Sequence, residues 1–323
     1  MERIDSLPTV LLTAILEFSD HQTLHNAERS CSLLRMAAKR GDVWELLARR
    51  RVVMRDEDDD QESHDTLARA WKAIACMAQL PCGRGQKLLR DVVACSSIDR
   101  PVETPTNTLH PSRCWIELRS LSDRATGDSR ADDEDVTRRN HANVAQMQCG
   151  CEMGQACYWS SAPSTDRNTR DFIDYRVQPG CMVSRFQIIP YRAYWHPESP
   201  TYAPFRVSVA FYAHSREDAS SISNLSCINS AHKHLLYESP PFQLINDMQL
   251  QEFELPRHVW LPHGAIMRLN VLGRYQAETI DAFPWLPDTE RTPHYYACLS
   301  FVDLLGVTVP ETVGTSLHVA SIG

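Results

Sequence analysis

Lysine is nearly absent from this chain of 323 residues. It occurs only at Lys39, Lys72, Lys87 and Lys233, so arginine supplies almost all of the 33 basic residues. The acidic residues number 41, which gives a formal net charge of −8. A chain of that charge repels phosphate backbones and anionic lipid surfaces. We therefore expect neither nucleic acid nor a membrane as a partner.

Long apolar runs and targeting signals are lacking as well. The most apolar stretch near the start, residues 10–16, is far too short to cross a bilayer and is closed by Glu17. Glu2 and Asp5 precede it, and no small-residue cleavage pattern follows, so it does not resemble a signal peptide. The 11 cysteines are odd in number and scattered, which favours reduced thiols. The expected location is the cytoplasm, the nucleus or both.

Motifs of the common enzyme classes are missing. The sequence has no Walker loop and no G-x-G-x-x-G, G-x-S-x-G or H-E-x-x-H pattern. The carboxylates of the two acidic runs lie in polar surroundings that leave their pKa values unperturbed, so solvated loops explain them. We expect a protein that is not an enzyme and needs no cofactor.

Two groups of thiols and imidazoles are candidates for metal binding. Cys149, Cys151 and Cys157 place three thiols within nine residues, and a second group lies in residues 227–234. Zinc prefers four such ligands in paired short spacings, and neither group alone has the spacing of a zinc finger or ribbon. Small buried thiols are the preferred interpretation, with a metal at the three cysteines as the open alternative.

The period of the hydrophobic pattern changes partway along the chain. Up to about residue 95, apolar residues recur at helical spacing, with the pair Ser19 and Gln22 in the form of a capping box. From about Tyr158 onward, β-branched and aromatic runs alternate with turn residues, as in the segment 206–211. Many strands without intervening helices favour an antiparallel sandwich over a parallel sheet.

The predicted fold class is therefore α+β and multidomain. Helices make up residues 1–50, and a helical spacer with an acidic loop follows in residues 51–100. A charged linker marked by prolines covers residues 101–144. An antiparallel β-sandwich covers residues 145–310, and residues 311–323 form a tail.

The helical start resembles the F-box. The resemblance is carried by Leu7-Pro8, Leu11-Leu12, Ile15-Leu16, Leu24, Cys31 and Trp44, in order and without a gap over 38 residues. It implies a three-helix module that docks onto the Skp-family adaptor of a cullin-based ubiquitin ligase, by laying an apolar helix face into a groove. The residues implied to bind the adaptor are Leu7, Pro8, Leu11, Leu12, Ile15, Leu16 and Leu24. Internal packing of the same residues on the second half is the alternative.

The second half resembles the β-rich domain of plant and protist F-box proteins, a jelly-roll sandwich similar to the galactose-binding-like (discoidin-like) fold. The resemblance is carried by Cys181 and by the segments 158–161, 190–194, 199–202, 237–240, 250–256, 272–276 and 296–298. Loops at one end of such a sandwich are candidates for recognition. Trp195, Trp260 and Trp285 are the candidate recognition residues, with packing under a loop as the alternative for each.

Taken together, the resemblances imply a non-catalytic substrate-recognition subunit of an SCF-type ubiquitin ligase. The helical start would bind the Skp-family adaptor and through it the cullin, and the sandwich would bind an unknown protein target. The ligase would then act by proximity. The alternative is a β-sandwich that binds carbohydrate and has no ligase role, and a further possibility is an interaction protein that uses the adaptor alone.

Overall fold

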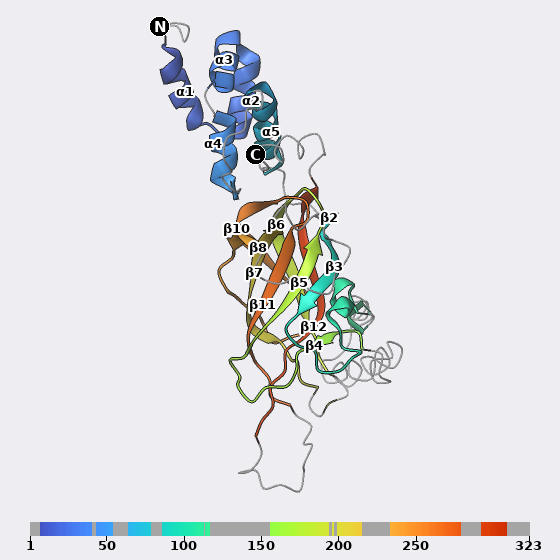
Figure 1. Cartoon of the computed structure of the whole chain (residues 1–323). Coiled ribbons are helices and arrows are strands. Elements are labelled where there is room, and N and C mark those ends of the chain that lie inside the picture. Colours follow the sequence, from blue (N-terminus) through green and yellow to red (C-terminus); the bar gives the residue numbers. More distant parts are fainter. Residues whose placement is uncertain are drawn as a thin grey trace, which may run out of the picture.

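The molecule consists of a helical unit mounted on one end of a two-layered β-structure (Figure 1). The computed structural model describes residues 7–40, 43–53, 64–78, 86–112, 114–116, 156–193, 196, 199–214, 233–278 and 292–308. None of the helices in these ranges is long and apolar enough to cross a membrane.

The helical unit contains five described helices. They are α1 (Thr9–Glu17), α2 (His21–Ser30), α3 (Ser32–Arg40), α4 (Val43–Arg51) and α5 (His64–Met77). Four of them fall within residues 1–51, where the resemblance implies three. The predicted capping box at Ser19 is also wrong, because Asp20 is the N-cap of α2 and its carboxylate accepts the backbone N–H of Thr23 at 2.7 Å.

A half-buried carboxylate joins three of these helices. Glu28 of α2 accepts a hydrogen bond from the indole N–H of Trp44 in α4 at 2.7 Å, and it also pairs with the ammonium of Lys72 in α5. The ring of Trp44 is buried in the helical core together with Leu24. The helical core is thus closed by both apolar packing and a satisfied polar contact.

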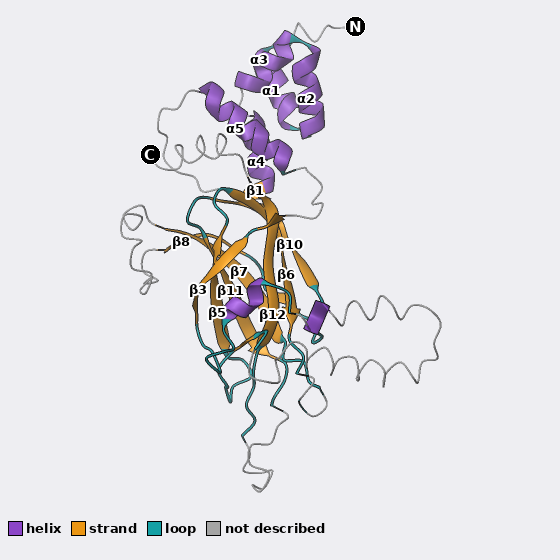
Figure 2. Ribbon diagram, turned by 90° about the vertical axis from the view of Figure 1, so that its right-hand side faces the viewer, coloured by secondary structure: helices purple, strands orange, loops and turns teal. Residues whose placement is uncertain are grey.

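The β-structure is a sandwich of two sheets, as predicted (Figure 2). The first sheet has the order β1 (Val52–Val53), β10 (Gln251–Leu261), β6 (Cys181–Pro190), β12 (Cys298–Thr308) and β2 (Gln86–Lys87), with β4 (Trp159–Ser160) also paired to β12. The second has the order β3 (Leu89–Cys95), β5 (Arg170–Val177), β11 (Ile266–Arg274), β7 (Pro204–His214) and β8 (Lys233–Glu238), with β9 (Phe242–Gln243) paired to β7. Among these pairings only β1 with β10 is parallel.

The sandwich core follows from the alternation of each strand. Inward-facing apolar side chains of both sheets meet between them, and the large ones include Trp159, Tyr175, Phe186 and Phe211, all fully buried. Alternate residues on β5, β6 and β11 point away from this core. The segment 206–211, which alternates in the sequence, lies in β7 as expected.

Two of the predicted boundaries are wrong. Residues 86–95, assigned to the helical spacer, form β2 and β3 of the sandwich, because the short apolar run 88–94 pairs with β5 and β12. Residues 101–112, assigned to the linker, pack on the sandwich through a 3₁₀ helix, Pro105–Leu109, in which Pro105 and Thr108 are buried. Apolar runs of this length are compatible with either helix or strand, and only long-range pairing decides between them.

A short parallel pairing fixes the helical unit to the sandwich. Val52 and Val53, directly after α4, pair with His258 and Val259 of β10. The guanidinium of Arg257 donates to the carbonyl of Val52 at 3.1 Å. The helices therefore continue into the first sheet without a free linker at this point.

Apolar packing reinforces that joint. Val307, Met182 and Trp260 are register neighbours on β12, β6 and β10, and they pack against the helical core. Because β6 begins and β12 ends at the joint, Pro190 and Cys298 lie at the opposite end of the sandwich. The molecule thus has a helical end and a loop end (Figure 1).

Candidate functional site

The seven residues implied to bind an adaptor divide into two faces of the helical unit. Leu12, Leu16 and Leu24 are buried in the helical core. Leu11 and Ile15 of α1 point outward, with 51% and 57% of their surface exposed. Pro8 is exposed and Leu7 is half-buried against the core. The inner residues thus pack mainly within the helical unit itself rather than on the second half of the chain, whereas the outer ones are exposed.

The outer face of α1 is an apolar stripe. Leu11, Ile15 and Phe18 recur at intervals of four and three residues, which places them on one side of the helix. Val10 lies beside them, and Val10 and Phe18 are even more exposed than the two predicted residues. We call these four residues the α1 stripe. The arginine side chain of Arg50 borders it, 6.0 Å from the Phe18 ring centroid.

The three candidate recognition tryptophans are not brought together by the described structure. Trp260 is buried at the joint with the helical unit, at the opposite end from the loops. This placement favours packing for that residue. Trp195 and Trp285 lie outside the described residues.

A pocket lies at the loop end of the sandwich. It encloses about 150 Å³. Its lining comes from the loop after β3, from β4, from the segments after β6 and from the segments on both sides of residues 279–291. The lining residues are Asp99, Arg100, Glu103, Tyr158, Ser160, Tyr191, Ala193, His196, Tyr202, Glu278, Tyr296 and Cys298. We call it the tyrosine pocket.

Aromatic rings form one wall of the tyrosine pocket. Tyr158 and Tyr191 stack with ring centroids 3.8 Å apart and planes 14° from parallel. Tyr202 and Tyr296 meet edge to face at 6.1 Å. The hydroxyl of Tyr202 lies 2.9 Å from Nδ1 of His196. These contacts fix the rings before any ligand arrives.

Carboxylates form the other wall. Asp99, Glu103 and Glu278 line the pocket together with a single cation, Arg100. The Arg100 side chain is 67% exposed, and its Nε lies 3.9 Å from Oδ2 of Asp99 and 4.0 Å from Oε1 of Glu103. The pocket therefore carries more negative than positive charge.

Glu103 stands out among these carboxylates because it is buried, with 4% of its surface exposed. The Tyr158 hydroxyl donates to its Oε1 at 2.9 Å. Its Oε2 has no hydrogen-bond partner among the residues that the structure describes. A buried acceptor without a partner is costly, which makes this oxygen a candidate contact point in the pocket.

Burial shifts the pKa values of these groups. It raises the pKa of Asp99, Glu103 and Glu278, and the hydrogen bond from Tyr158 opposes that rise at Glu103. Burial, together with the charge of Arg100, lowers the pKa of His196 to about 4. At neutral pH the imidazole is therefore uncharged and does not compensate the carboxylates.

A buried ion pair holds the loops around the pocket in place. The guanidinium of Arg274 donates to Oδ2 of Asp171 at 2.7 Å, to the carbonyl of Ala162 at 2.9 Å and to the carbonyl of Tyr295. Asp171 also accepts the hydroxyl of Ser97 at 2.7 Å. One charged network thus connects β5 and β11 to three of the segments next to the pocket.

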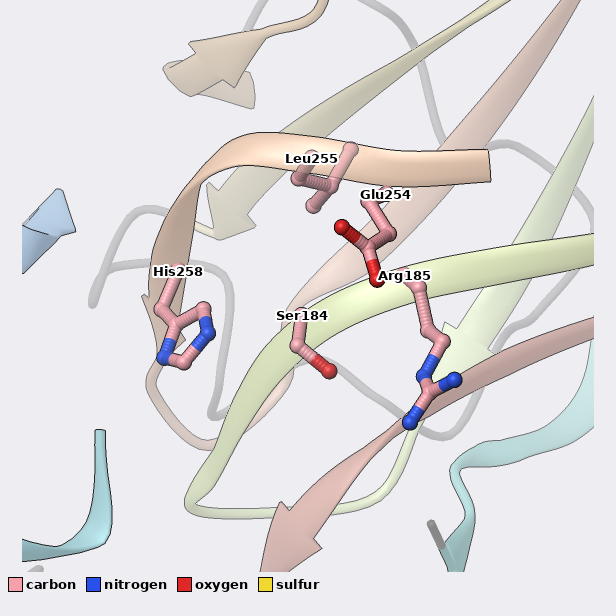
Figure 3. A pocket seen from close by; sticks show the side chains of 5 residues that line it. All are labelled: Ser184, Arg185, Glu254, Leu255 and His258. Atoms are coloured by element: carbon pink, nitrogen blue, oxygen red, sulfur yellow. The ribbon is translucent and has the colours of Figure 1, made fainter. Parts of the chain in front are cut away.

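A second, smaller cavity of about 90 Å³ lies on the first sheet near the joint (Figure 3). Its lining is Ser184, Arg185, Glu254, Leu255 and His258. It opens where the pairing of β10 with β6 is irregular and its register shifts between Glu254 and Val259. A volume of this size holds about three water molecules, so it is the weaker candidate.

Sequence reasoning missed the tyrosine pocket as a site. Tyr158, Tyr191, Tyr202 and Tyr296 carry the family resemblance, yet nothing in the sequence connects them with residues 99–103. No motif links these segments, because each supplies at most three lining residues from a different part of the chain. In residues 99–103 the sequence offers only Pro101 as a signal, and that proline indicates a linker.

The cysteine clusters are only partly visible. Cys149 and Cys151 lie outside the described residues, whereas Cys157 lies with its sulfur 4.0 Å from that of Cys114. Within the described ranges no group of three or more His, Cys, Asp and Glu side chains is arranged to hold a metal ion. The second group at residues 227–234 falls almost entirely outside those ranges.

The chain matches no protein-family model, and no curated protein matches its sequence. Similar folds do occur among solved structures. Chitosan-binding module 1 of a chitosanase/glucanase from Paenibacillus sp. IK-5 is 10% identical over 68% of this chain and 96% of that chain, with a TM-score of 0.31. XRCC1, in a structure with the DNA pol beta catalytic domain, is 12% identical over 70% of this chain and 100% of that chain, with a TM-score of 0.30.

Several other similar structures are family 32 carbohydrate-binding modules. One, CBM32-3 from a family 31 glycoside hydrolase of Clostridium perfringens, is 10% identical over 46% of this chain and 75% of that chain, with a TM-score of 0.26. At these identities and scores, no ligand or partner transfers to this chain.

Proposed function

We propose that this chain is a non-catalytic binding protein whose β-sandwich takes a ligand in the tyrosine pocket. The observation that carries the proposal is the buried Oε2 of Glu103, which lines the pocket without a hydrogen-bond partner among the described residues. Pockets with preformed aromatic walls and a few buried polar groups are typical ligand sites.

Carbohydrate is one class of ligand that such a pocket could hold, since aromatic rings stack on sugar faces and carboxylates accept hydrogen bonds from hydroxyl groups. The test is a glycan array with the full chain, in parallel with a peptide array. Specific binding on either array supports the proposal if Glu103→Gln or Tyr296→Ala weakens it. Glu238→Gln, an exposed position on β8 in the second sheet, serves as the control. Signals that ignore both pocket variants would refute a ligand site there.

A second candidate function is the substrate receptor of an SCF-type ubiquitin ligase, with the Skp-family adaptor bound to the α1 stripe. The exposed apolar side chains of the stripe favour it, because a contiguous apolar face on a small helical unit is suited to a partner's groove. The order of residues from Leu7 to Trp44 adds the resemblance to the F-box. In this function the tyrosine pocket would hold the target at the other end.

The adaptor hypothesis is testable by co-purification of the full chain with a Skp-family adaptor. Leu11→Asp and Ile15→Asp change exposed side chains, so we expect them to abolish binding while the chain stays folded. Ile245→Asp, an even more exposed apolar position on the sandwich, is the control and should bind normally. No binding by the wild type, or equal binding by all variants, would rule out this function.

A further inference from the structure

The size of the tyrosine pocket limits what it can hold. Its volume of about 150 Å³ is roughly half of the lower end of the ~300–1,000 Å³ range of small-molecule sites. The end of a single side chain, or a group of that size, fits such a space. An oligosaccharide or a nucleotide would have to lie largely outside it.

The charge of the pocket selects the sign of that group. Asp99, Glu103 and Glu278 face it, whereas the only lining cation is Arg100. His196 is neutral at physiological pH because burial lowers its pKa to about 4. A buried carboxylate requires a positive or hydrogen-bonding partner to offset its desolvation.

Arg100 does not already supply that partner. Its Nε stands 4.0 Å from Oε1 of Glu103, and two thirds of its side chain is in solvent. Exposed pairs at such distances contribute little. Oε2 of Glu103, buried and without a described hydrogen-bond donor, is open to a donor that enters the pocket.

The aromatic wall is suited to the same kind of group. The stacked pair Tyr158 and Tyr191 and the edge-to-face pair Tyr202 and Tyr296 line the same pocket as the carboxylates. Cations are attracted to the faces of such rings, and the attraction is stronger where water is displaced. A neutral donor could hydrogen-bond to Glu103, but it would not offset the negative charge of the three lining carboxylates.

We infer that the tyrosine pocket binds an organic cation, the ammonium or guanidinium end of one lysine or arginine side chain on a target protein. The cation donates to Glu103 and lies between its carboxylate and the tyrosine rings. This inference rests on the proposed ligand-binding function and names the chemistry of its ligand. An amino sugar carries the same ammonium group but has a larger body than the pocket volume accommodates.

The test uses the full chain and fluorescein-labelled pentapeptides, Gly-Gly-X-Gly-Gly, read by fluorescence polarisation. X is lysine, arginine, acetyl-lysine or glutamine, and unlabelled glucosamine and N-acetylglucosamine compete in separate wells. We expect the lysine peptide, the arginine peptide or both to bind at least tenfold more tightly than the acetyl-lysine and glutamine peptides. Raising the salt concentration should weaken that binding.

Variants connect the binding to the pocket. Glu103→Gln should reduce binding of the cationic peptide about tenfold or more, and Glu278→Gln, at a half-buried position, should reduce it as well. The second variant keeps the test valid if the first fails to fold, which circular dichroism would reveal. Glu238→Gln should bind like the wild type.

The outcomes distinguish a failure of this inference from a failure of the proposed ligand-binding function. Equal binding of the lysine and acetyl-lysine peptides overturns the inference that the pocket selects a cation. Binding of sugars alone, lost in Glu278→Gln, overturns it too but leaves the pocket as a ligand site. Failure of every peptide and glycan to bind overturns both. Cationic peptides that bind all variants equally place recognition elsewhere and also contradict the inference.

Discussion

Glu103 shows how a single side chain ties stability to pH. Burial raises the pKa of its carboxyl, and the nearby charge of Asp99 adds to the rise, while Tyr158 and Arg100 oppose it. A carboxyl whose pKa is raised by folding binds its proton more tightly in the native state than in the unfolded chain. Its stabilising effect is complete below the unfolded pKa and is lost as the pH rises through the folded pKa.

Glu103→Gln should therefore raise the free energy of unfolding at pH 7 by about 1 kcal/mol, because it removes a buried charge that the native state must desolvate. The amide can still accept the Tyr158 hydroxyl, but carries no charge. Below about pH 4, where the carboxyl is protonated in both states, the variant and the wild type should be equally stable. Urea unfolding from pH 4 to pH 8 measures the difference. A lower stability of the variant at pH 7 would contradict the prediction.

At the scale of elements, the close approach of β12 to β6 requires glycine at position 306. The register of the two strands shifts between Leu305 and Gly306. A Cβ added at Gly306 would stand 2.0 Å from the carbonyl oxygen of Met182, which is backbone and cannot rotate away. The shift thus brings the backbones of the two strands so close together that a residue with a Cβ at position 306 would clash.

Gly306→Ala should lower the free energy of unfolding by about 3 kcal/mol, since the neighbouring strand must move. Gly264→Ala is the matched control. Gly264 has a φ of +77° with open space around its Cβ position, so alanine there costs only the conformational strain of about 1–2 kcal/mol. Chemical denaturation of both variants measures the two costs. An equal or larger loss for Gly264→Ala would show that the close approach is not the cause.

The sequence predicts strands with alternating apolar residues better than strands that bury charge. The alternation in β7 and β11 marks both as half-buried. In β5, Asp171 and Asp174 interrupt the pattern, and both are buried because Arg274 and Arg268 reach them from β11. An ion pair between residues about a hundred positions apart leaves no local signal, so the alternation of apolar residues does not mark this strand.

The same reason explains what could be predicted of the binding sites. The inner and outer faces of α1 follow from helical spacing, which a single segment contains. The tyrosine pocket draws its lining from separate loops, and its buried Glu103 was placed in a linker. Strand pairing across the sandwich, not local preference, brings these residues together.

At the scale of the whole molecule, Trp260 connects the two units. It packs into the helical core, whereas its neighbour Leu261 points into the core of the sandwich. Two consecutive residues of one strand therefore stabilise different parts of the molecule. Their alternation lets β10 hold the helical unit on the first sheet.

Trp260→Ala should destabilise the chain by about 3–5 kcal/mol and should expose the helical unit first. Hydrogen exchange resolved by segment is the measurement, with faster exchange expected in α1 to α4 and little change in β11. Leu261→Ala is the control, since it should accelerate exchange in the sandwich strands. Unchanged exchange in the helices of Trp260→Ala would show that Trp260 does not hold the helical unit on the sandwich. This tryptophan would then again be a recognition candidate.

The opposed ends of the sandwich also set a distance. β12 runs 11 residues from the tyrosine pocket to the joint, which at about 3.3 Å per residue is roughly 36 Å. Because β1 joins the sheet directly, this length is fixed by hydrogen-bonded strands and does not vary as a flexible tether would. Whatever binds the α1 stripe is thus held at least a strand's length from whatever enters the pocket. If both proposed sites are occupied, the sandwich fixes the distance between the two bound partners.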